Sequence, residues 1–303
     1  MSKTISVSIG FPAYNESANI ANIINDILQQ NQSNFRIQSI IVVNDGSSDN
    51  TANIVTSIKN PLIQLINHQN RSGLAAAQNT LIESNKSEIL VLINSDAKII
   101  DKDFISKLID PLIKGEADLT SAKITPLKSA NIISQILNFS NDFKQSIYDK
   151  LNNGNNIYSC YGLAKAFNKN FLREFRFKKG VGEDAYCFLW SKMNNYAFCP
   201  IKNTTIYFKS PTSFHDHLLQ SNRAFHSQTI YFEEFPKSMI LESYKIPLFL
   251  LVSQTVKYFF KNPFFFSIYL AITSISFFKS KIVKKTGENW QMAKSSKVLI
   301  SSK

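Results

Sequence analysis

The sequence predicts an α/β protein built around a mostly parallel β-sheet. Over about the first hundred residues, short apolar runs typical of strands alternate with segments whose apolar residues recur every three or four positions, as on one face of a helix. The run Ile89–Ile93 contains no polar residue, which is typical of a strand buried on both faces of a sheet. These observations predict a β-α-β-α-β-α-β succession with right-handed crossovers.

Each element of this succession has its own pattern. The first strand alternates Ile5, Val7 and Ile9 with polar residues, which is typical of a strand and not of a signal peptide. The expected strands cover residues 5–11, 40–43, 62–66 and 89–93, and the helices between them contain residues 20–28, 55–58 and 74–82. Residues 101–236 contain no long linker, so we expect them to continue the same domain and to supply a second binding face.

Composition narrows the class of partner. The chain has 303 residues, a net charge of +12 and three cysteines without a CxxC pair, which is typical of reduced thiols in a cytosolic protein. Its charge indicates anionic partners: nucleic acid, phosphorylated small molecules or an acidic membrane surface. No nucleic-acid-binding signature is present, so we expect no nucleic acid partner. His215 and His217 lack a third ligand at a recognisable spacing, so a zinc site is not favoured there.

Three of the expected strands end in groups suited to a nucleotide. Asp96 follows the strand at 89–93, Asp45 follows the strand at 40–43, and the first strand leads into Tyr14 and Glu16. Ligands of open α/β sheets bind at the carboxyl ends of the strands, so we expect these side chains to share one crevice. An aromatic ring there stacks on a base, and a carboxylate accepts hydrogen bonds from a base or ribose. Asp96 itself either caps the following turn or holds a metal ion or phosphate.

The sequence lacks the glycine-rich loops that commonly bind phosphate, so phosphate binding at this crevice would require other groups. The sequence contains neither GxGxxG nor GxxxxGK[ST]. If a diphosphate binds, a divalent metal ion held by Asp96 is the natural substitute, because hard cations favour carboxylate and phosphate oxygens.

Five motifs in order resemble those of family 2 glycosyltransferases with a GT-A fold. They are Pro12–Glu16, Val43–Thr51, Arg71–Asn79, Asn94–Asp96 and Gly182–Asp184. The resemblance covers about residues 5–225. It implies a GT-A-type, mostly parallel central sheet with flanking helices, and inverting transfer of a sugar from a nucleotide-diphosphate sugar with Mg²⁺ or Mn²⁺ as cofactor.

The resemblance also implies roles for single residues. The residues carried over to nucleotide binding are Pro12, Tyr14, Glu16, Asp45 and Arg71. Asp96 would hold the metal ion on the diphosphate, with Asn94 where the family usually has a first acid. In the pair Glu183 and Asp184, Asp184 would be the general base that takes the proton of the acceptor hydroxyl. Taken alone, this pair is more typical of acids that cap the helix that follows.

Two further segments match the family in part. Gln220 and Arg223 resemble part of a QxxRW motif, with Ala224 in place of tryptophan, so Arg223 would pair with the diphosphate and Gln220 would line the acceptor path. A solvated helix face is the competing interpretation of these two residues. Gly162 matches a small-residue segment where the backbone would approach the sugar or acceptor.

The C-terminal part changes in composition. Residues 264–278 carry no charge, but fifteen residues span only about 22 Å as a helix, short of the roughly 30 Å core of a bilayer. We therefore expect an apolar helical segment that is re-entrant or interfacial, with lysines facing an anionic membrane surface. The alternative is a pair of core helices that pack on the catalytic domain.

The predicted organisation has three parts: residues 1–110 as the nucleotide-sugar-binding half, 111–236 as the acceptor-binding half with the catalytic base, and 237–303 as a membrane-associating tail. The predicted function is transfer of a sugar to an acceptor hydroxyl at the cytosolic membrane face, and the tail indicates a lipid-linked acceptor. The alternative hypothesis is a catalytically impaired nucleotide-sugar-binding or scaffold protein, because Asn94 and Ala224 depart from the family pattern.

Overall fold

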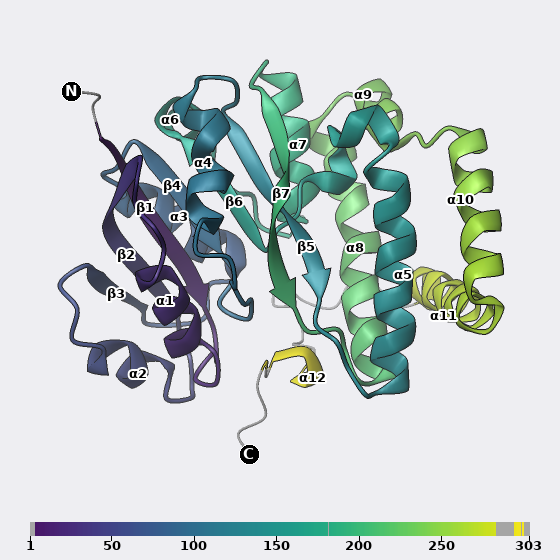
Figure 1. The fold of residues 1–303 in the computed structure, drawn as a ribbon, viewed down its shortest axis with the longest axis horizontal. Coiled ribbons are helices and arrows are strands. Elements are labelled where there is room, and N and C mark those ends of the chain that lie inside the picture. Colours follow the sequence, from purple (N-terminus) through teal and green to yellow (C-terminus); the bar gives the residue numbers. More distant parts are fainter. Residues whose placement is uncertain (1–3, 181, 283–293, 298, 300–303) are drawn as a thin grey trace.

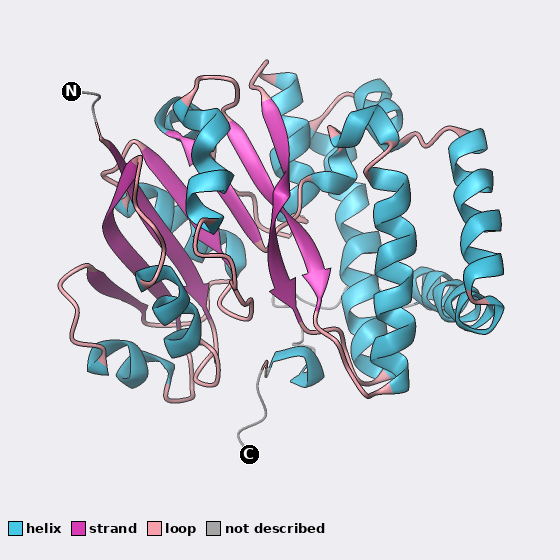
Figure 2. Cartoon of the chain, viewed as in Figure 1, coloured by secondary structure: helices cyan, strands magenta, loops and turns pink. Residues whose placement is uncertain are grey.

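A computed structural model describes residues 4–180, 182–282, 294–297 and 299. A central seven-stranded sheet has helices on both faces, as Figures 1 and 2 show. The strands are β1 (Ile5–Ala13), β2 (Phe35–Asp45), β3 (Ile63–His68), β4 (Ile89–Ile93), β5 (Leu119–Pro126), β6 (Ala164–Asn168) and β7 (Phe198–Phe208). The predicted α/β class with a mostly parallel sheet is therefore confirmed.

The helices alternate with these strands and then dominate the C-terminal third. They are α1 (Ile20–Leu28), α2 (Thr51–Ser57), α3 (Leu74–Ser84), α4 (Phe104–Ile113), α5 (Ile132–Tyr148), α6 (Lys169–Glu174), α7 (Glu183–Met193), α8 (Phe214–Glu234), α9 (Lys237–Tyr244), α10 (Leu248–Lys261), α11 (Pro263–Ile282) and α12 (Lys294–Lys297). Two short 3₁₀ helices, Leu151–Gly154 and Ile157–Ser159, precede β6.

The strand order in the sheet is β3-β2-β1-β4-β6-β5-β7. β1 pairs in parallel with both β2 and β4, and β2 pairs in parallel with β3. β6 runs antiparallel to its neighbours β4 and β5, while β5 and β7 are parallel. The loops that follow β1, β2 and β4 therefore leave the sheet at the same edge.

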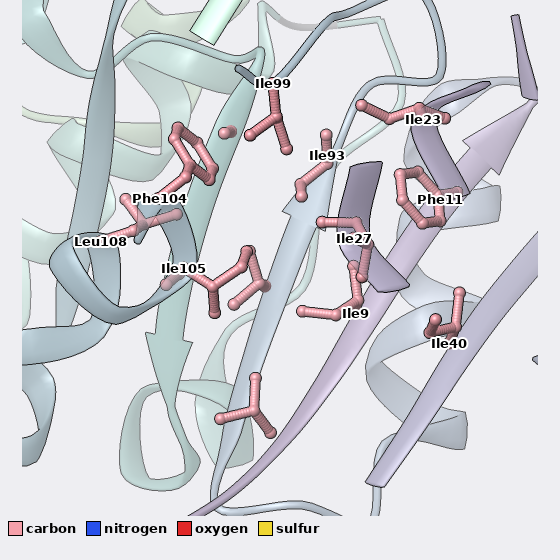
Figure 3. Packing of buried hydrophobic residues seen from close by; sticks show 14 of the residues in the cluster. Ile9, Phe11, Ile23, Ile27, Ile40, Ile93, Ile99, Phe104, Ile105 and Leu108 are labelled. Carbon is pink, nitrogen blue, oxygen red and sulfur yellow. The ribbon is translucent and has the colours of Figure 1, made fainter. Parts of the chain in front are cut away.

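Alternating side chains of β4 fill two separate cores. Ile89, Val91 and Ile93 belong to a buried cluster with α1 and α4, and Leu90 and Leu92 belong to a cluster on the opposite face with α3 and α7. Figure 3 shows the first cluster, in which apolar residues of α1 and α4 face those of the central strands. Burial on both faces explains why this strand contains no polar residue.

The second strand is longer than the sequence indicates. The apolar run predicts residues 40–43, but β2 begins at Phe35 and ends at Asp45. Its first half alternates buried Phe35 and Ile37 with the exposed Arg36 and Gln38, and it pairs with the start of β1. The prediction was too short because only the second half of the strand is buried on both faces.

Helices α10 and α11 form a separate layer at one end of the molecule (Figure 1). They pack on α5, where Phe143 makes edge-to-face contacts with Tyr258 and Phe266 at centroid distances of 5.5 and 5.3 Å. Among the residues that the structure describes, no helix combines the length and the apolar character needed to cross a bilayer.

Candidate functional site

The loops after β1, β2 and β4 line one pocket of about 320 Å³. All the residues predicted from the sequence to bind nucleotide or metal line it, and the acidic pair and the α8 segment each contribute one residue. The predicted residues in its wall are Pro12, Tyr14, Glu16, Asp45, Arg71, Asn94, Asp96, Glu183 and Gln220. The convergence expected from the parallel strand order is therefore observed.

The loops after β1 and β2 are fastened to each other by hydrogen bonds. Asn15 has a left-handed backbone conformation with φ of 53°, which asparagine adopts more readily than most residues. Its backbone N–H donates to Ser47 Oγ at 2.9 Å, and the Ser48 N–H donates to its side-chain oxygen at 2.9 Å. The Glu16 N–H donates to Thr51 Oγ1 at 2.8 Å. These bonds fix the positions of Tyr14 and Glu16 in the pocket wall.

Asp45 fastens the loop that carries Arg71. Its carboxylate accepts the backbone N–H groups of Ser72 and Gly73, each at 2.8 Å, and lies 2.8 Å from His68 Nδ1. The predicted contact between Asp45 and the nucleoside thus competes with bonds that this carboxylate already makes within the protein. Asp45 therefore stabilises the loop that carries Arg71 and also forms part of the pocket wall.

Tyr14 and Arg71 form a cation–π pair in the pocket. The guanidinium carbon of Arg71 lies 4.1 Å from the centre of the Tyr14 ring. A stacked guanidinium holds the aromatic ring in place and brings a fixed positive charge to the pocket. A base that stacks on Tyr14, as the sequence predicts, would share the ring with this guanidinium.

The turn after β4 is held by one hydrogen bond within its own backbone and by two to neighbouring segments. The Ala97 N–H donates to the Asn94 carbonyl at 3.2 Å, the Asn94 N–H donates to the Leu163 carbonyl at 2.9 Å, and Ser95 Oγ donates to the Pro12 carbonyl at 3.2 Å. None of these bonds uses the Asp96 carboxylate, which lines the pocket.

The oxygens of Asp96 and Asn94 fit a hard divalent cation that takes its remaining ligands from substrate and water. The described part of the chain contains no group of three or more histidine, cysteine or acidic side chains that could hold a metal by itself. The site therefore has the kind of ligand oxygen that Mg²⁺ or Mn²⁺ favours. A cation here would need further oxygens, such as those of a diphosphate, to complete its coordination.

Glu16 is almost completely buried beside this turn. Its carboxylate accepts a hydrogen bond from Asn19 Nδ2 at 3.0 Å and forms an ion pair with Lys297. Burial, with repulsion from Asp96, raises the pKa of Glu16 to about 7, although Lys297 and Asn19 act in the opposite direction.

The acidic pair lies at the beginning of α7. Glu183 and Asp184 occupy the first turn of this helix, where the exposed backbone N–H groups favour negative charge. Glu183 lines the pocket, whereas Asp184 lies outside the residues that line it. The side chain of Asp184 is 46% exposed, so it faces solvent from which an acceptor could arrive.

A buried lysine holds Asp184. Lys165, on β6, is 3% exposed and its Nζ lies 2.7 Å from Asp184 Oδ1. Burial alone would lower the pKa of Lys165, but the Asp184 carboxylate reverses this effect and raises it, so the lysine remains charged. Lys165 therefore fixes one oxygen of Asp184 and leaves the other for a further partner.

Gly162 lies directly against the same carboxylate. A Cβ added at this position would come within 2.3 Å of Asp184 Oδ1. The close approach expected of Gly162 is thus made to Asp184, which the sequence places at the catalytic base, and no larger residue fits without moving that carboxylate.

The α8 segment is only partly described. Gln220 lines the pocket and its Nε2 donates to Ser296 Oγ at 3.3 Å. Arg223 belongs to α8, but its side chain lies outside the described residues. The predicted pairing of Arg223 with a diphosphate therefore stays a prediction.

The family profile described as Glycosyl transferase family 2 matches residues 8–176, more than half of the chain. The chain belongs to glycosyl transferase family 2. The matched segment contains most of β1, the whole of β2 to β6, and the loops after β1, β2 and β4 that line the pocket.

Curated relatives match this family 2 member over shorter segments. Glycosyltransferase GlyG of Streptococcus pneumoniae serotype 4 is 30% identical over 121 residues, 39% of this chain and 38% of the relative. UDP-Glc:alpha-D-GlcNAc-diphosphoundecaprenol beta-1,3-glucosyltransferase WfgD of Escherichia coli is 31% identical over 90 residues, 30% of this chain and 34% of the relative. The chain thus spans less than two fifths of the length of each of these relatives.

Solved structures with the same fold cover more of the chain. The mannosyltransferase PcManGT from Pyrobaculum calidifontis, in complex with GDP-Man and Mn²⁺, superposes with a TM-score of 0.58 at 15% identity, over 94% of this chain and 77% of that one. Glucosyl-3-phosphoglycerate synthase from Mycobacterium tuberculosis, with Mn²⁺, UDP and product, gives 0.54 at 17% identity, over 80% and 81%. At these identities the likeness shows the fold.

Two charged residues of this family 2 member were not found from the sequence. Lys165 follows Ala164 and precedes Ala166 in a strand, and a lone lysine among small and apolar residues was the available signal. Lys297 gave no such signal, because its position in the pocket depends on how the distant C-terminal segment folds back.

Replacement of Glu16 by glutamine should remove a pH dependence of stability. Because the folded-state pKa of Glu16 is raised from 4.5 to about 7, the folded state binds its proton more tightly than the unfolded state does. As pH rises between about 5 and 8, the free energy of unfolding of the wild type should fall relative to Glu16→Gln, by up to about 3 kcal/mol. Denaturant titrations across this range measure the difference.

The matched control is Glu83→Gln, which changes an acid exposed on α3. This control removes a negative charge at an exposed position and reports the general effect of that change. A pH dependence of the stability difference that is no larger for Glu16→Gln than for Glu83→Gln would contradict the raised pKa of Glu16.

Proposed function

We propose that this protein transfers a sugar from a nucleotide-diphosphate sugar to an acceptor hydroxyl, with inversion at the anomeric carbon. The observation that carries the proposal is the separation of two acidic groups. Asp96 lines the pocket suited to the donor, and Asp184 lies outside that pocket beside Lys165. A single displacement requires a base on the acceptor side and charge stabilisation on the leaving diphosphate, and these two tasks need separate carboxylates.

The donor pocket supplies binding and orientation. Arg71 carries a positive charge held against Tyr14, and Asn94 and Asp96 would hold Mg²⁺ or Mn²⁺. The metal ion, when bound, neutralises the charge that develops on the leaving diphosphate. The protein's own contribution is to fix these groups on three loops that are fastened to one another.

Asp184 performs the proton transfer in this proposal. As the acceptor oxygen forms its bond to the anomeric carbon, the bond from that carbon to the diphosphate oxygen breaks and the hydroxyl proton passes to Asp184. Lys165 already occupies Oδ1, so the proton goes to Oδ2. Gly162 lets the carboxylate lie in this position because it has no side chain to displace it.

Substitution of the two acids should separate their tasks. Asp184→Asn should lower the rate of transfer by about 100-fold or more, the usual contribution of a general base, while donor binding in the presence of Mn²⁺ is retained. Asp96→Asn should weaken binding of donor and Mn²⁺ together. Release of nucleoside diphosphate from a panel of UDP- and GDP-sugars measures turnover, and calorimetry measures binding. Unchanged turnover in both variants would refute the proposal, and nucleotide binding without any product would favour the scaffold hypothesis.

Lys165 should act as a positioning residue for Asp184. Lys165→Met replaces a buried cation by an apolar chain of similar length, and Asp184 stays hydrated because it is half-exposed. The variant should fold, keep the KM for the donor and lose about 10- to 100-fold in kcat through misplacement of the base. Lys123→Met, which breaks the Lys123–Asp149 ion pair elsewhere on the sheet, is the matched control. A drop in kcat of the same size in both variants would contradict a role specific to Asp184.

We further propose that the protein works at the cytosolic face of an anionic membrane, on a lipid-linked acceptor. On α10, Phe249, Val252, Val256 and Phe260 are exposed and spaced three or four residues apart, so they form one apolar stripe. Phe249 and Phe260 are 85% and 77% exposed. Such a stripe with lysines beside it suits a peripheral, interfacial helix. The names of two relatives refer to a polyprenyl-linked molecule: diphosphoundecaprenol for WfgD, and dolichyl phosphate for a beta-glucosyltransferase of Trichomonas vaginalis.

Vesicle binding tests the membrane proposal. The wild type should float with vesicles that contain phosphatidylglycerol, and the double variant Phe249→Glu/Phe260→Glu should lose at least about tenfold in binding because charge enters the interface. Ile100→Glu adds a charge at another exposed apolar residue and should bind like the wild type. Wild-type protein that stays out of the vesicle fraction, or equal loss in the Ile100 variant, would contradict the proposal.

A further inference from the structure

The C-terminal residues 294–297 and 299, here called the tail segment, lie across the donor pocket. Figure 1 shows α12 beneath the ends of β5 and β7, far along the chain from the loops of β1 and β4. Ser296 and Lys297 belong to the pocket wall together with Glu16 and Asp96. A part of the chain outside the matched family segment thus completes the donor site.

Hydrogen bonds hold the tail segment at both of its ends. The Ser295 N–H donates to Asp216 Oδ2 at 2.8 Å, and the Thr212 N–H donates to Ser295 Oγ at 3.1 Å. At the other end, the Leu299 N–H donates to Asn19 Oδ1 at 3.3 Å, and Asn19 Nδ2 donates to the Lys297 carbonyl. The segment is therefore fastened to the beginning of α8 and to the loop before α1.

These bonds place the ammonium group of Lys297 between two carboxylates. Lys297 Nζ forms an ion pair with Glu16 and lies 3.6 Å from Asp96 Oδ2. Asp96 is the carboxylate whose oxygens fit a divalent cation. A lysine ammonium and a divalent metal ion at the same carboxylate repel each other strongly in a partly buried site, because little solvent screens them.

We propose that Lys297 occupies the cation position at Asp96 and that a divalent metal ion binds this carboxylate only by displacing it. While the pocket holds no metal ion, the single positive charge of Lys297 is shared between the carboxylates of Glu16 and Asp96. A metal ion that arrives alone must break the lysine contact and gains few ligands in return. A metal ion that arrives with a diphosphate brings its own ligands, and the diphosphate offers the displaced ammonium a new anionic partner.

This inference rests on the proposed function in one respect, the assignment of Asp96 as the carboxylate that takes the metal ion. The competition between Lys297 and a divalent metal ion for Asp96 does not itself require sugar transfer. The binding of Mn²⁺ alone, without any sugar donor, therefore tests it.

The experiment compares Mn²⁺ binding by the full chain and by Lys297→Met, followed by the electron paramagnetic resonance signal of free Mn²⁺. The variant should bind Mn²⁺ at least about tenfold more tightly than the wild type, a typical size for coupling between two ligands. Lys179→Met removes a charge from an exposed lysine in the same pocket wall and controls for the general effect of net charge. Equal or weaker Mn²⁺ binding by Lys297→Met, or equal gains in both variants, would overturn the proposal.

A second measurement guards against misfolding of the variant. Mn²⁺ that binds the folded state should raise the melting temperature of Lys297→Met more than that of the wild type. The added substitution Asp96→Asn should abolish this gain, and a gain that persists would overturn the proposal because the ion would then bind elsewhere. If the wild type transfers no sugar but Lys297→Met binds Mn²⁺ more tightly than the wild type, the proposed function is refuted and this inference stands.

Discussion

The parallel pairing of β1 with β2 and β4 is the constraint on which the site depends. Parallel strands direct their carboxyl ends to one edge, so three loops that are distant in sequence meet around one pocket. β4, next to β1, is apolar throughout because both of its faces are buried in the two cores. Hydrogen bonds between the loops then fix the pocket wall: the Asn15 N–H donates to Ser47, and N–H groups of the Arg71 loop donate to Asp45.

Two lysines from different parts of the chain are paired with acids at or beside the pocket. Asp184 is paired with Lys165 from the adjoining strand β6, whereas Asp96 and Glu16 share Lys297 from the C-terminal segment. The two pairs differ in permanence. The Lys165 side chain is 3% exposed and is enclosed by the core, whereas the Lys297 side chain is 27% exposed and lies on the four-residue helix α12. The first pair suits a fixed base, and the second suits a site that must open to admit a charged ligand.

The two C-terminal helices serve the fold and expose an apolar surface at the same time. Aromatic residues of α10 and α11 pack edge-to-face against α5, which ties them to the domain. The opposite face of α10 carries Phe249 and Phe260 into solvent. The two interpretations left open by the sequence, core helices and membrane contact, therefore concern different faces of the same helix. Packing on α5 accounts for one face only.

The sequence by itself determined the α/β class, the order of the first strands and the loop residues that line the pocket, because hydrophobic periodicity and strand-end chemistry are local. The sequence pattern underestimated the length of β2, because the first half of this strand is exposed on one face. Only the tertiary structure decided which charges meet. Lys165 reaches Asp184 across nineteen positions and Lys297 reaches Glu16 across 281, and no local pattern encodes such contacts. Electrostatic partners depend on where the chain folds back, which is a property of the whole packed molecule.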